Sequence, residues 1–309
     1  MQREINLSSP LVLPSDQVTY PERISLDNPQ DVLAEVKKII LLIFREFKFS
    51  RFEQAFVDII KLFNGNYPGY RRCNTLYHDL NHTMDCLLVT VKLIHGAFVN
   101  GVMFEQRDVT LGLISALMHD TGYIQAVGDD TGTGAKYTVC HIKRSIEFLK
   151  KYFHDNRFPP EYLPICSDLL RCTGLDVKIA EIKFQSPEYE ILGKILGTAD
   201  LIGQMANENY LEKLPLLYDE FKEGGVPGYI DEDDLLKKTP AFWEMVKERF
   251  ALELGQVDLY LRDYWRVLWG INQDLYRQAI DRNIERLQSL LATRRPTSQG
   301  IREANIKWV

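Results

Sequence analysis

Two short segments combine imidazole and carboxylate side chains in a way that suits a metal ion. Tyr77–Asp85 places His78 and His82 four residues apart at the start of an apolar run, and His119 and Asp120 end a second apolar run. Residues four apart share one face of a helix, so His78 and His82 could point into the same cavity. Mixed ligands of this kind suit Zn, Mn, Fe or Mg, and a catalytic site needs about three or four of them with one position left for water.

A further carboxylate lies inside an apolar segment. Asp200 follows Gly197-Thr198-Ala199 and precedes Leu201 within a predicted helix over Ile191–Met205. Because burying a lone charge costs several kcal/mol, we expect Asp200 to have a cation or hydrogen-bond partners.

Apolar residues at helical spacing predict the elements that must position these side chains. Asp27-Asn28-Pro29 is typical of a helix start, and a break at Gly224–Gly228 separates two later helical stretches. Convincing strand alternation is missing, so we expect an all-α fold. The other predicted helices cover Phe52–Phe63, the histidine segment from Tyr77 on to Gly96, Val109–Met118, Ile142–Phe153 and Leu163–Cys172. From Tyr210 onward the pattern stays helical, and the long aromatic-rich segment Pro240–Leu291 should pack on the preceding bundle.

Composition excludes several classes of protein. The 309 residues are 45% hydrophobic, enough for a sizeable core, and the net charge of -6 gives no basic footprint for duplex nucleic acid. Five cysteines form no CxxC pair, which favours a reducing cytosol over a disulfide framework. The start of the chain lacks a secretory signal and no window has eighteen apolar residues, so we expect a cytoplasmic protein without a membrane partner.

The order H...HD...D, formed by His82, His119-Asp120 and Asp200, resembles the HD superfamily of metal-dependent phosphohydrolases. Tyr77–Asp85 is also similar to the YHNxxHAxDV signature of class I cyclic nucleotide phosphodiesterases. The resemblance covers about residues 70–205. It implies that His82, His119, Asp120 and Asp200 ligate a first divalent metal, that Asp120 can bridge to a second, and that His78 protonates the leaving oxygen.

The sequence departs from these patterns at two positions. Tyr123 stands where the families have the last residue of HDxxH or HDxxK, and Asp79 replaces the asparagine of YHN. His141 is the candidate substitute ligand, with a structural role at a helix start as the equal alternative. Arg144, one turn further on, could meet a phosphate oxygen.

Other titratable residues have simpler interpretations. Asp85 could hold a ligand histidine from outside the ligand set, or equally make a structural hydrogen bond. His95 and His154 are more typical of structural histidines near helix ends.

The prolines near the start of the chain, the polar residues at its end and the resemblance together predict a domain organisation. We expect an extended arm over 1–27, a single HD-type domain over 28–292 and a polar tail over 293–309. Within the domain, the HD core would cover about 70–205 and a C-terminal helical part 206–292.

The leading hypothesis is a metal-dependent phosphohydrolase that uses one or two divalent ions on a small phosphorylated substrate, most plausibly a nucleotide or cyclic nucleotide phosphodiester. The alternative is a catalytically degenerate HD domain that binds a nucleotide or a partner protein without turnover, motivated by Tyr123. A third is a helical scaffold stabilised by a metal. The oligomeric state stays open.

Overall fold

The computed structural model describes residues 24–26 and 28–293, and the structural statements below concern these residues. All but residue 293 of the predicted tail and nearly all of the predicted N-terminal arm lie outside them. The described chain forms eleven α helices and no strand, apart from one isolated bridge between Tyr70 and Ala126, so the all-α prediction is confirmed. The helices are α1 Pro29–Ile43, α2 Ser50–Phe63, α3 Leu80–Val99, α4 Gln106–Met118, α5 His141–Asp155, α6 Tyr162–Arg171, α7 Pro187–Met205, α8 Tyr210–Glu223, α9 Glu232–Leu252, α10 Tyr260–Trp269 and α11 Leu275–Ala292.

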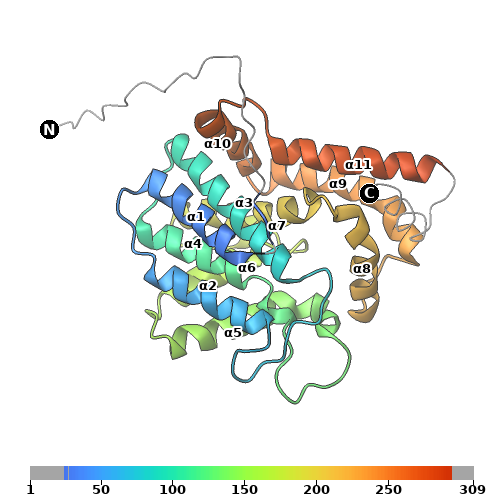
Figure 1. Ribbon diagram of the computed structural model, residues 1–309, viewed down its shortest axis with the longest axis horizontal. Helices are drawn as coiled ribbons and strands as arrows, with labels where there is room; N and C mark the ends of the chain where they lie inside the picture. The colour runs from blue at the N-terminus through green and yellow to red at the C-terminus, as the bar shows by residue number, and fades with distance from the viewer. Residues whose placement is uncertain (1–23, 27, 294–309) are drawn as a thin grey trace.

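Helix α3 lies at the centre of the bundle. It packs against α1, α4, α7 and α10, so that helices from both halves of the chain surround it (Figure 1). Its length and hydropathy would suit a membrane span, but 83% of its most apolar window is buried inside the protein. These properties therefore fit the core helix of the bundle.

Capping side chains set the helix starts. Asn28 accepts a hydrogen bond from the backbone N–H of Gln30, and Pro29 follows it as the first residue of α1, as the sequence predicted. Asp231 caps α9 in the same way. Asp231 and the three acidic residues after it start α9, and Pro240 lies inside this helix.

The C-terminal helices cover one side of α3 and α7. Helix α10 packs on α3, and α11 packs on α7 and α9 (Figure 1). The aromatic side chains of Trp243, Phe250, Tyr264 and Trp265 are buried in these contacts, which agrees with the prediction that this segment packs on the preceding bundle.

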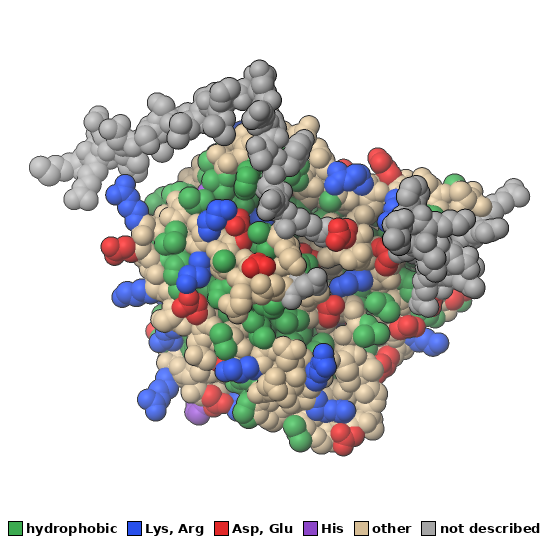
Figure 2. All heavy atoms as spheres, in the orientation of Figure 1, with side chains coloured by type: hydrophobic (Ala, Val, Ile, Leu, Met, Phe, Trp, Pro, Cys, Tyr) green, Lys and Arg blue, Asp and Glu red, His purple; other side chains and the backbone are tan. Residues whose placement is uncertain are grey.

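On the face in Figure 2, acidic and basic side chains are interspersed among apolar ones. Among the residues coloured there, neither charge gathers into a continuous track. This face therefore does not present the basic stripe that binding to a nucleic-acid backbone requires.

Candidate metal centre

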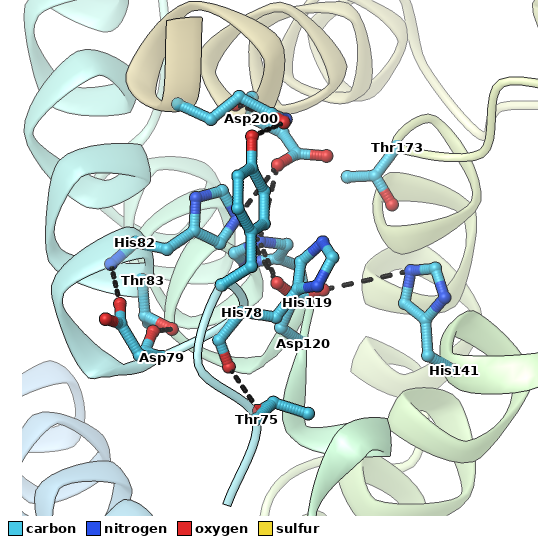
Figure 3. Close-up of polar contacts among 12 residues, drawn as sticks. Thr75, His78, Asp79, His82, Thr83, His119, Asp120, His141, Thr173 and Asp200 are labelled. Carbon is cyan, nitrogen blue, oxygen red and sulfur yellow. Dashed lines mark hydrogen bonds and ion pairs between the residues drawn. The ribbon is translucent and has the colours of Figure 1, made fainter. Parts of the chain in front are cut away.

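Four side chains from three separate segments of the chain meet in one cluster. His82 comes from the first turn of α3, His119 and Asp120 follow the end of α4, and Asp200 comes from α7 (Figure 3). The Nε2 atom of His82 lies 3.1 Å from Oδ1 of Asp200 and 3.2 Å from Oδ2 of Asp120. The two Nε2 atoms of His82 and His119 are 3.2 Å apart. The group His82, His119 and Asp200 is buried and could hold a metal ion.

The hydrogen bonds of His119 test whether a cation fits. Its Nδ1 lies 2.8 Å from the carbonyl oxygen of Ala116, so this nitrogen carries the proton of the neutral ring and Nε2 presents a lone pair. Oδ2 of Asp120 lies 3.2 Å from that Nε2. This oxygen is buried and has no hydrogen-bond partner in the described part of the chain. Lone pairs of nitrogen and oxygen that face each other need a cation or a proton between them, so the donor set fits a divalent metal.

The shifted pKa values in the cluster also indicate that a positive charge is stabilised there. Burial by itself would lower the pKa of the His82 imidazole, but Asp120 and Asp200 raise it to about 9. The pKa of His119 is likewise raised well above its ordinary value, against the effect of burial. Burial would raise the pKa of Asp120 and Asp200, yet the two imidazoles hold both well below the ordinary range. Without metal, the site therefore takes up protons at its imidazoles.

His78 lies near the cluster, but it is not on helix α3 as its spacing predicted. It precedes α3, because Asp79 is the N-cap and accepts a hydrogen bond from the backbone N–H of His82. The shared helix face expected for His78 and His82 was therefore wrong. A turn places His78 instead, since the hydroxyl of Thr75 donates to its carbonyl oxygen over 2.7 Å.

Glu220, on α8, was not singled out from the sequence. Its Oε2 accepts from Nδ1 of His78 over 2.6 Å, and its Oε1 accepts from the backbone N–H of Tyr77 over 2.7 Å. Glu220 is only 4% exposed although it is charged. No spacing rule connects α8 with the histidine segment 142 residues earlier. The two contacts show that the C-terminal helices help to build the site.

Tyr123, the departure from the HDxxH pattern, packs its ring against two imidazole rings. It is 2% exposed, and its ring centroid lies 4.4 Å from that of His78 and 4.7 Å from that of His141. Nε2 of His141 lies 3.8 Å from Oδ1 of Asp120, and its Nδ1 donates to the carbonyl oxygen of Thr138. His141 therefore stands at the edge of the cluster with Nε2 free of its proton in the neutral ring.

Gly122 permits this approach of His141. A Cβ atom on Gly122 would lie 1.9 Å from the carbonyl oxygen of His141, closer than any side chain allows. The backbone N–H of Gly122 donates to Ser145, and the Ser145 hydroxyl donates to the carbonyl oxygen of His119. The start of α5 is thereby fixed against the end of α4.

Arg144 is engaged away from the cluster. Its guanidinium donates to the carbonyl oxygens of Gly122 and Ile124 over 2.7 and 3.0 Å, and it stacks on the ring of Tyr137. These contacts hold the loop that follows Asp120. Thr173, at the end of α6, faces the cluster beside Asp200 in Figure 3 and was not predicted from the sequence.

The fold and the site together define an all-α protein with a buried histidine and aspartate cluster able to hold a metal ion. The chain belongs to the Npun_R2479-like family, whose model matches residues 36–147 and 129–259, well over half of the 309 residues. That family name describes no activity, so the match assigns no reaction. No curated protein matches the chain.

Proposed function

We propose that this protein is a metal-dependent phosphohydrolase that acts on a small phosphate ester, with a nucleotide or cyclic nucleotide phosphodiester as the favoured class. The observation that carries the proposal is a buried cluster of two imidazoles and two carboxylates from three separate helical segments. Their nitrogen and oxygen lone pairs point toward one another. Two carboxylates and two neutral imidazoles carry two negative charges, which a divalent ion balances.

His82, His119, Asp120 and Asp200 would hold the ion, with His141 as the candidate for a second one beside Asp120. When bound, a divalent ion lowers the pKa of water and polarises a phosphoryl group. The hydrogen bond from His119 to Ala116 fixes that ring in the tautomer a ligand requires.

His78 supplies the proton that the leaving oxygen needs. Its Nδ1–H is held by Glu220, so its Nε2 is the atom from which a proton can pass to substrate. Glu220 keeps the ring oriented, and Tyr123 packs flat on one face of it. The ring is thereby held in one position, as a general acid requires.

Turnover of bis-p-nitrophenyl phosphate tests the proposal, measured with Mn²⁺, Zn²⁺, Fe²⁺ and Mg²⁺ in turn. We expect hydrolysis that His119→Ala and Asp120→Ala abolish. His154→Ala is the matched control, because the His154 side chain is 88% exposed and remote from the cluster in sequence and contacts. Turnover that survives both cluster variants would contradict the assignment.

One observation favours a second candidate, a domain that binds a nucleotide or partner without turnover. The ring of Tyr123 packs on both His78 and His141, where the resemblance would have an imidazole or an ammonium group. Under this alternative, nucleotides would raise the melting temperature while no metal supports product formation.

A further inference from the structure

The buried His82 ring is held differently from the three other histidines around the cluster. Nδ1 of His78, His119 and His141 each has a protein acceptor, namely a glutamate or a backbone carbonyl oxygen. Nδ1 of His82 is buried and has no hydrogen-bond partner in the described part of the chain. Because Nε2 of His82 faces the carboxylates, Nδ1 carries the proton when the neutral ring serves as a ligand. A buried N–H without an acceptor is unfavourable, because it has lost its hydrogen bond to water.

A small cavity adjoins this ring. Its volume is about 10 Å³, enough for one water molecule, and polar side chains contribute to its walls. It is lined by Tyr77, His82, Asp85, Gln204, Asn207 and Lys213. A water molecule needs two to four polar partners, and all six lining residues carry polar groups.

Asp85 supplies the one carboxylate of the lining, and its position is fixed. Asn207 donates from Nδ2 to Oδ2 of Asp85 over 2.6 Å. The orientation of the Asn207 amide is set, because its Oδ1 accepts the backbone N–H of Asn209. Both an anionic acceptor and the His82 ring therefore line the cavity.

We propose that Asp85 is a positioning residue for His82 and acts through one ordered water in this cavity. Nδ1–H of His82 donates to the water, and the water donates to the Asp85 carboxylate. The relay fixes the tautomer in which Nε2 is free to bind the metal and makes that nitrogen a stronger donor. This inference rests on the metal centre of the proposed function, but it does not require that the protein hydrolyse anything.

Metal binding by Asp85→Asn, followed through the visible absorption of Co²⁺ under competition with a chelator, tests the relay. The variant should bind Co²⁺ about 10- to 100-fold more weakly, the usual effect of removing an outer partner of a ligand histidine. Asp58→Asn is the matched control, since Asp58 is also a hydrogen-bonded carboxylate but is buried on α2, where it contacts Tyr152. Unchanged affinity in Asp85→Asn would overturn the proposal.

Two measurements separate positioning from a merely structural role. In protein labelled with ¹⁵N-histidine, the ring shifts of His82 should report one tautomer in the wild type and a mixture in Asp85→Asn. A crystal structure of the wild type should show a water within hydrogen-bond distance of both Nδ1 of His82 and Asp85, which keeps the test decisive even if the variant folds poorly. If His82→Ala fails to weaken Co²⁺ binding, the metal centre itself is wrong. If His82→Ala weakens Co²⁺ binding but Asp85→Asn does not, the relay alone is wrong.

Discussion

Helix α3 carries two histidines that are equally buried and behave in opposite ways. His82 and His95 are each 3% exposed. Two carboxylates from other segments surround His82 and raise its pKa to about 9, whereas burial lowers the pKa of His95 to about 4. His95 packs edge-on against the ring of Tyr264, with the ring centroids 5.5 Å apart. Burial alone therefore does not make a histidine a candidate metal ligand. The neighbouring carboxylates, one after the end of α4 and one on α7, distinguish His82 from His95.

Removing one of the two carboxylates beside His82 should reduce the difference between His82 and His95 most strongly. Asp200→Asn leaves the shape of the site but removes one of the two charges that hold the His82 proton or a metal. Loss of an outer partner of a ligand weakens metal binding by about 10- to 100-fold. We expect a larger loss of metal affinity in Asp200→Asn, because Asp200 itself offers a ligand atom. Isothermal titration with Zn²⁺ measures this, and affinity within a few-fold of the wild type would remove Asp200 from the centre.

His78 should affect turnover without affecting metal. His78→Gln should lower kcat by about 10²–10⁴-fold, the usual range for loss of a general acid, and leave metal content unchanged. Glu220→Gln should lower kcat less, because the ring keeps a hydrogen-bond partner at Nδ1. Steady-state kinetics on protein assayed for metal would separate these effects. Loss of metal in His78→Gln would make His78 part of the ligand set.

The all-α fold could be predicted from the sequence because apolar spacing and caps such as Asn28 are local signals. The metal group could be predicted only as an ordered pattern of residue types. His78 shows why the rest could not be found: a helical spacing rule assigned it to α3, but Asp79 starts the helix after it. Glu220 depends on the packing of α8 against a segment 142 residues earlier, and no local pattern encodes that contact.

The lowered pKa of His95 predicts that its contribution to the free energy of unfolding is lost in acid. Its pKa is lower in the folded protein than the unfolded value of 6.5, so its contribution is complete above pH 6.5 and is lost as the pH falls through about 4. The loss is at most about 3 kcal/mol, from 1.36 kcal/mol for each pKa unit. Urea unfolding between pH 4 and 7 should show a smaller loss for His95→Asn than for the wild type. Equal slopes would mean that the ring is protonated inside the fold.

His82 should give a similar or smaller effect with the opposite sign, in protein freed of metal by a chelator. Its folded pKa of about 9 exceeds the unfolded value, so its contribution is complete below pH 6.5 and is lost as the pH rises through about 9. Urea unfolding of metal-free His82→Asn should therefore lose less stability over this range than the metal-free wild type. Part of the slope should remain, because the pKa of His119 is raised by the same carboxylates. Metal-loaded wild type is the control, since a cation at Nε2 replaces the proton whose release produces the slope. A flat profile for the metal-free wild type would show that Asp120 and Asp200 do not hold protons on these imidazoles, and His82 would then differ from His95 in its neighbours but not in its charge.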